Sequence, residues 1–130
     1  MDTGALKTAK LTMIKAPHKL ASTAIDDRGP AGLPVGEPIV KLRSKPYHDL
    51  PKAGVWEATP GKFRRQVKEA EFSHFIAGRC KFHHDGGETL DIEPGDAVFF
   101  PANTQGTWEI IETTRKTYLI IATRVKILRY

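Results

Sequence analysis

A glutamate and two arginines on neighbouring predicted strands are the residues best placed to do chemistry. Glu71 begins a phenylalanine-rich segment, Glu71–His83, and Arg64 and Arg65 lie in the segment before it, Lys62–Lys68. A carboxylate that faces an apolar interior needs a charged partner or a raised pKa, and either arginine could be that partner. Glu71 is therefore a structural ion-pair residue, or a general acid–base group and ligand anchor, unless it is exposed and does neither.

His74 follows Glu71 by three residues and is the histidine nearest to that carboxylate in the sequence. An offset of three on a regular strand places two side chains on opposite faces of the sheet. The two could converge on a metal ion only through a β-bulge. The spacing favours a hydrogen-bonded histidine on the outer face, or at a dimer contact, over a metal ligand.

Trp56 and Trp108 are candidates for the walls of a small-molecule pocket. Trp108 lies two residues after Gly106, so the two positions share one strand face, and a glycine there leaves space beside the indole. The alternative is that both tryptophans fill the core. The single cysteine, Cys80, excludes an internal disulfide and a cysteine-based zinc cluster, and we expect it to be a buried small hydrophobe.

Length, composition and charge exclude several classes of protein. The 130 residues suit one domain, and 40% hydrophobic with 27% charged residues is a globular composition. No run approaches the roughly 18 apolar residues of a membrane helix, and lysines interrupt the N-terminal segment where a signal peptide would be apolar. We therefore expect a cytoplasmic protein without a membrane partner. The net charge of +5 is spread along the chain, which does not favour nucleic-acid binding.

The pattern of turns predicts two parts, an N-terminal arm over residues 1–49 and one all-β domain over residues 50–130. Asp26–Pro38 contains three prolines and three glycines, which predicts a partly irregular arm that wraps the domain or a partner, or is mobile. Short strands about 8–12 residues apart are typical of a sandwich or a barrel. The expected strands are Ile39–Arg43, Val55–Ala58, Lys62–Lys68, Glu71–His83, Thr89–Ile92, Ala97–Phe100, Gly106–Glu112 and Tyr118–Thr123.

Three segments of the chain carry a resemblance to a known family. They are GVWEATPGKF (Gly54–Phe63), EFSHFIAGR (Glu71–Arg79) and EPGDAVFFPANTQGTWEI (Glu93–Ile110). This combination resembles the cupin superfamily, and within it the small cupins related to the ureidoglycine aminohydrolase domain and the ethanolamine-utilisation cupin. The resemblance covers about residues 50–125. It implies a cupin-type jelly-roll β-barrel, commonly assembled as a homodimer.

The resemblance also implies where a divalent metal would lie, because cupins usually hold one inside the barrel on three histidines and a glutamate. Glu71 lies seven residues before Gly78 and so matches the glutamate. The three histidine positions carry other residues, which are Arg65 and Val67 (or Arg64 and Gln66) and Gly106.

One of four expected ligands therefore remains, and a single carboxylate does not hold a transition metal. We expect no cofactor. If a divalent transition metal were nevertheless present, its ligands would be Glu71, His74 and Gln105, the last of which is adjacent to the third histidine position.

Three functions remain open from the sequence. The first is a metal-independent cupin that binds a small organic ligand in the barrel through Trp56, Arg64, Arg65, Glu71 and Trp108. The second is an enzyme on a small polar metabolite, aminohydrolase- or isomerase-like, with Glu71 as the catalytic acid–base group and with or without a metal. The third is a structural or assembly subunit. The expected partners are the small molecule and a second copy of the chain.

Overall fold

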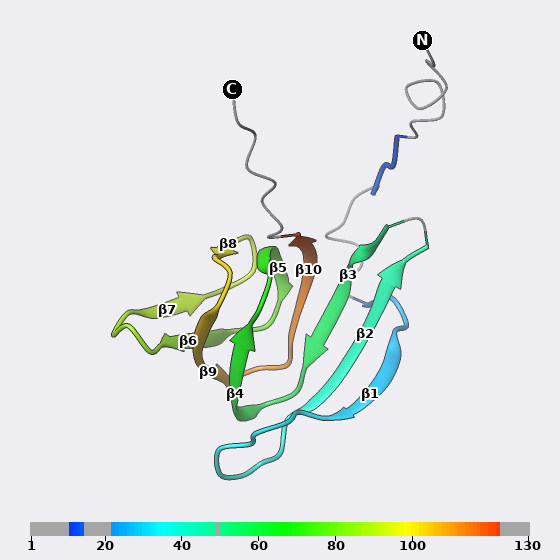
Figure 1. Ribbon diagram of the computed structural model, residues 1–130. Helices are drawn as coiled ribbons and strands as arrows, with labels where there is room; N and C mark the ends of the chain where they lie inside the picture. Colours follow the sequence, from blue (N-terminus) through cyan, green and yellow to red (C-terminus); the bar gives the residue numbers. More distant parts are fainter. Residues whose placement is uncertain (1–10, 15–21, 49, 123–130) are drawn as a thin grey trace, which may run out of the picture.

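The computed structural model describes residues 11–14, 22–48 and 50–122 (Figure 1). These residues form ten β-strands and no α-helix, so the expectation of an all-β fold is confirmed. No helix in the described ranges is long and apolar enough to cross a membrane. The strands are β1 (Asp26–Pro30), β2 (Lys41–Tyr47), β3 (Leu50–Ala58), β4 (Gly61–Val67), β5 (Ala70–Ala77), β6 (Cys80–His84), β7 (Thr89–Ile92), β8 (Ala97–Phe100), β9 (Thr104–Ile110) and β10 (Thr114–Ile121).

The strands form two antiparallel sheets that face each other, as in a jelly roll. The larger sheet has the order β1-β2-β3-β10-β5-β8 and the smaller has the order β4-β9-β6-β7. Figure 1 shows the two sheets without strand pairing that would close them into a continuous barrel. Consecutive strands often lie in different sheets, which brings segments far apart in the sequence to the space between them.

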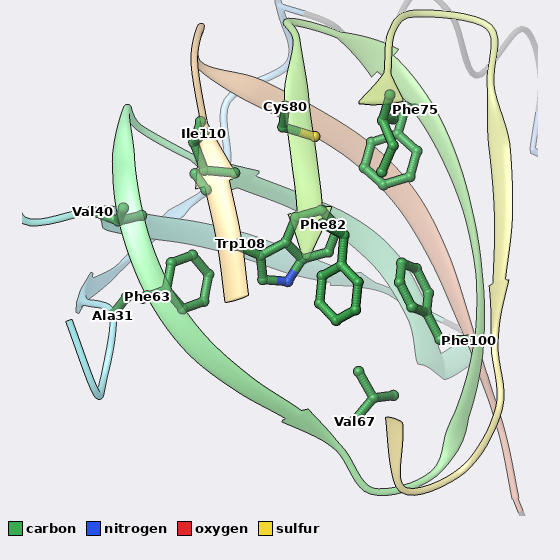
Figure 2. Close-up of a cluster of buried hydrophobic side chains, with 12 residues drawn as sticks. Ala31, Val40, Phe63, Val67, Phe75, Cys80, Phe82, Phe100, Trp108 and Ile110 are labelled. Carbon is green, nitrogen blue, oxygen red and sulfur yellow. The ribbon is translucent and has the colours of Figure 1, made fainter. Parts of the chain in front are cut away.

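Aromatic side chains pack around Trp108 in the core between the two sheets. The indole contacts Phe82, Phe100 and Phe75, with ring centres 4.9, 5.8 and 6.1 Å away (Figure 2). These rings come from both sheets, because inward-facing residues alternate with outward-facing ones along each strand. Tilted and edge-on ring pairs add to the stabilisation that burial of their apolar area provides. Cys80 is buried in the same cluster, as expected.

The expected long strand Glu71–His83 is in fact two strands that belong to different sheets. β5 ends at Ala77 in the larger sheet, and β6 begins at Cys80 in the smaller one. Between them Gly78 has φ +82°, and a Cβ at this residue would collide with the carbonyl oxygen of Thr113. Glycine alone tolerates both the conformation and the close approach, so it forms the corner between the sheets.

Part of the expected N-terminal arm belongs to the domain. β1 and β2 extend the larger sheet next to β3, and Ile25, Ala31 and Val40 are buried. Proline and glycine are tolerated in β1 because it is an edge strand with an irregular register between Asp27 and Gly29. Residues 1–10 and 15–21 of the arm lie outside the described residues.

We predict that Gly78→Ala destabilises the protein more than Gly87→Ala does. Both glycines have positive φ, but a Cβ at Gly87 meets nothing within 4 Å. Gly87→Ala should therefore cost only the backbone strain of about 1–2 kcal/mol. Gly78→Ala adds a steric collision and should cost at least about 1 kcal/mol more. Urea unfolding of both variants measures the difference, and equal losses would contradict the role of Gly78 as the corner.

Candidate functional site

A cavity of about 190 Å³ lies between the two sheets and collects the predicted site residues. Trp56, Arg65, Glu71 and Trp108, four of the five residues expected to bind a ligand, line it. The remaining lining residues are Ser44, Val67, Phe100, Lys116, Tyr118 and Ile120. A wider hollow of about 440 Å³ beside β7 and β8 includes His84 and Glu88, but none of the predicted site residues.

The central feature of the cavity is a buried ion pair between Lys116 and Glu71. The Lys116 Nζ lies 2.6 Å from Oε2 of Glu71, and the Ser73 hydroxyl donates a hydrogen bond of 2.6 Å to the same oxygen. The side chains of Lys116 and Glu71 are only 7% and 10% exposed. β10 pairs with β5 in a register that sets Lys116 opposite Phe75, so the lysine stem runs along the sheet to reach Glu71.

The pair changes the pKa of both partners. Burial would raise the pKa of Glu71, but the charge of Lys116 and the hydrogen bonds from Lys116 and Ser73 outweigh it and hold that pKa below its usual value. Burial lowers the pKa of Lys116, and the charge of Arg65 lowers it further. The charge and the hydrogen bond of Glu71 raise that pKa but offset the decrease only in part. Glu71 is therefore a carboxylate at neutral pH, and Lys116 gives up its proton more readily than a surface lysine.

Four aromatic rings surround the Lys116 ammonium on its other sides. Its Nζ lies 4.7 Å from the ring centre of Trp56, 5.4 Å from that of Trp108, 5.6 Å from that of Phe100 and 5.7 Å from that of Phe75. The faces of aromatic rings carry partial negative charge and attract a cation at these distances. One carboxylate and four rings thus replace the water that the ammonium loses on burial.

The residues of the cavity do not fit a divalent metal ion. Arg65, Val67 and Glu71 line the cavity together, so the structure selects Arg65 and Val67 as the two histidine positions. Neither side chain is a metal ligand, and the carboxylate of Glu71 already holds the Lys116 ammonium. Within the described ranges, no group of three or more His, Cys, Asp or Glu side chains is placed to hold a metal ion.

The third histidine position, Gly106, does not offer a metal ligand either. The free space that was expected beside Trp108 at this glycine is taken by the Phe82 ring. A Cβ at Gly106 would collide with that ring and with the carbonyl oxygen of His83. A histidine at this position would therefore displace the core, not line the cavity.

The alternative metal set of Glu71, His74 and Gln105 is not assembled. Glu71 is buried on the inner face of β5, whereas His74 borders an apolar hollow on the outer face with Phe72. Gln105 is exposed on β9 between buried neighbours, so it too faces outward. The three side chains therefore do not meet, as the offset of three between Glu71 and His74 predicts.

The two arginines, which the sequence could not separate, have different positions. Arg64 donates hydrogen bonds of 2.7 and 2.6 Å to the Asp85 carboxylate and one of 3.1 Å to the Thr107 hydroxyl. It is therefore held at the surface and does not line the cavity, contrary to its expected role as a ligand-binding residue. Arg65, one residue later, points to the opposite face of β4 and lines the cavity.

Sequence reasoning missed Lys116, because the last strand was expected to begin at Tyr118. β10 begins at Thr114, four residues earlier. The signal was available in the alternation of the strand, since Tyr118 and Ile120 both line the cavity and Lys116 precedes them with the same period of two. Tyr118, which shares this period, and Ser44, which no pattern marks, were missed as well.

Comparisons with known proteins agree with this fold. Residues 49–118 match a family model described as the EutQ-like cupin domain. The EutQ protein of Clostridium difficile has a similar structure, with a TM-score of 0.67 and 18% identity over 88% of this chain and 90% of that one. No curated protein sequence matches this chain.

Two further solved structures share the fold. A protein of unknown function from the DUF861 family of Pseudomonas syringae has a TM-score of 0.66 and 22% identity, over 77% of this chain and 45% of that one. The present chain thus spans less than half of that protein. A predicted oxalate decarboxylase from Thermotoga maritima has a TM-score of 0.57 and 18% identity, over 78% of this chain and 96% of that one.

We predict that Lys116→Met lowers the free energy of unfolding by about 3–5 kcal/mol, because it leaves the Glu71 carboxylate buried without its partner. The matched control is Lys81→Met, which breaks a surface pair with Asp91 and should cost less than about 1 kcal/mol. Adding Glu71→Gln to Lys116→Met should restore part of the loss, since no unpaired charge then remains. Urea unfolding of the four proteins measures these values. A Lys116→Met loss no greater than that of Lys81→Met would contradict the buried pair.

Proposed function

Because this chain belongs to the EutQ-like cupin family, we propose that it is a metal-independent cupin that binds a small organic anion in the cavity between its sheets. The observation that carries this proposal is the Lys116–Glu71 pair. It takes up the one carboxylate that matches the family glutamate, and it borders a cavity of about 190 Å³. Drug-sized ligands occupy about 300–1,000 Å³, so a smaller molecule is expected here.

The charge of the cavity supports an anionic ligand. Lys116 and Arg65 each contribute a positive charge, and Glu71 contributes one negative charge. The excess of one positive charge suits a single carboxylate group. Arg65 is exposed on its strand and presents a planar guanidinium, which binds a carboxylate through two parallel hydrogen bonds. Trp56 and Trp108 provide apolar walls for the rest of the molecule.

The enzyme alternative also has an observation in its favour, which is a buried carboxylate beside a cavity. The lowered pKa of Glu71 keeps its side chain ionised, so in such a reaction it could serve only as the proton acceptor and not as the general acid that the sequence left open. An aminohydrolase- or isomerase-like reaction would then begin with proton abstraction by Glu71.

We predict that small carboxylates bind to the protein and that Arg65→Met weakens this binding by at least about 10-fold, because the charge-assisted hydrogen bonds of the guanidinium are lost. Calorimetric titration with lactate and with pyruvate measures the affinity. Arg64→Met is the matched control, because Arg64 is an adjacent arginine held by Asp85 away from the cavity. Its affinities should equal those of the wild type. An equal effect of both variants would show that net charge and not the cavity binds the anion.

A homodimer remains part of this proposal, and the outer face of the larger sheet is the surface we assign to it. Strand register aligns Phe99, Phe72 and Leu119 in one row across β8, β5 and β10, and these side chains are 54%, 45% and 46% exposed. The row contains no charged residue. Two copies of a chain with a net charge of +5 can therefore meet there without bringing like charges together.

We predict that the wild-type protein sediments as a dimer and that Leu119→Arg converts it to a monomer, because a charge would be buried in the apolar row. Val35→Arg is the control, since Val35 is a similarly exposed apolar residue outside the row. Analytical ultracentrifugation distinguishes the two states. A monomeric wild-type protein would show that this face is not an interface between copies.

A further inference from the structure

We propose that Lys116 captures a small carbonyl compound that also carries a carboxylate, such as a 2-oxo acid, by forming an imine at its Nζ. This inference rests on the proposed function, since the compound must enter the same cavity. It goes beyond reversible binding, because it assigns a covalent step to a residue that the family resemblance does not include.

The placement of Lys116 distinguishes it from every other described lysine. It is the only lysine that is buried in the part of the chain that the structure describes, and its side chain lines the cavity. A lysine attacks a carbonyl carbon only as the neutral amine, which an apolar setting favours. The four rings around the ammonium exclude water from its sides, and the cavity remains as the direction from which a ligand can approach.

Glu71 is placed to move the proton that this step requires. Its Oε2 lies 2.6 Å from the Lys116 Nζ, within the range for direct proton transfer. Transfer of one ammonium proton to Glu71 gives the neutral amine, whose electron pair forms a C–N bond to the carbonyl carbon as the C=O π bond breaks. The second nitrogen proton passes to that oxygen and gives a carbinolamine.

Loss of water completes the step and restores the charge of the pair. The Glu71 carboxyl returns its proton to the carbinolamine hydroxyl, the C–O bond breaks, and water leaves as the C=N bond forms. The product is an iminium ion and a Glu71 carboxylate, so one cation and one anion are still paired. No oxidant or reductant is consumed, and the aromatic rings stabilise the iminium as they stabilise the ammonium.

Arg65 accounts for the carboxylate of the proposed compound. Arg65 and Lys116 line the same cavity, which is too small for a drug-sized molecule. A 2-oxo acid carries its carboxylate and its carbonyl on adjacent carbons, so one small molecule can pair with the guanidinium and present its carbonyl to the amine. A hydroxy acid of the same size binds in the same way but cannot form the imine.

The test is reductive trapping of the full-length protein with pyruvate and sodium cyanoborohydride. The hydride reduces an iminium to a stable secondary amine, which mass spectrometry of the intact protein counts and peptide mapping locates. We expect one dominant adduct, at Lys116, formed at least about 10-fold faster than any adduct at the exposed Lys62 and suppressed by excess lactate. Arg65→Met keeps Lys116 and Glu71 but removes the proposed partner of the ligand carboxylate, and it should slow the adduct at Lys116 by about 10-fold or more.

The outcomes separate this inference from the proposed function. If lactate and pyruvate bind in calorimetry but Lys116 is labelled no faster than Lys62, the imine is wrong and the binding function stands. If neither acid binds and Lys116 is not labelled, both are wrong. Peptide mapping of the wild-type protein decides this without any variant, so a folding defect in Arg65→Met leaves the result interpretable.

Discussion

The removal of the Lys116 ammonium from water is the constraint on which the rest of the site depends. A buried charge is tolerated only with a partner of opposite charge and enough polarisable or polar neighbours. Glu71 supplies the opposite charge, Ser73 donates a second hydrogen bond to the same carboxylate oxygen, and the Trp56 and Trp108 rings lie beside the cation. A change to any of these groups therefore affects both the stability of the fold and the chemistry available at the cavity.

The fold brings these groups together through the way its strands divide between two sheets. Lys116, Glu71 and Ser73 lie on neighbouring strands of the larger sheet, whereas Trp108 lies in the smaller one. The chain passes from one sheet to the other at Gly78, where only glycine fits against the backbone of Thr113. The spacing of seven residues between Glu71 and this glycine therefore fixes the distance along β5 from the corner to the carboxylate.

The sequence predicted the residues that belong to repeating patterns and missed those that depend on long-range contacts. The cupin fold follows from the resemblance that three motifs carry, and the opposite faces of Glu71 and His74 follow from strand periodicity. The inward position of Glu71 was one of the alternatives that the sequence left open. The separation of Arg64 from Arg65 requires knowledge of which strand face is inside, and Asp85, which holds Arg64, is 21 residues away. The partner of Glu71 was expected to be an arginine on the preceding strand, but that strand, β4, lies in the smaller sheet. The partner is Lys116 of β10, which pairs with β5 in the larger sheet and comes 45 residues after Glu71.

The exchange of a metal ion for an ammonium group changes what a cupin cavity can do. Either cation would neutralise a carboxylate at the position of the family glutamate, but a metal ion offers open coordination positions, whereas an ammonium offers protons. Once an ammonium proton moves to Glu71, the same atom becomes a nucleophile, which a metal ion cannot be. The cation at this position is also part of the chain, so it cannot be lost by dilution or chelation. The ligands proposed for such a cavity accept a hydrogen bond or react with an amine, and the positive charge of Arg65 would favour those that also carry a negative charge.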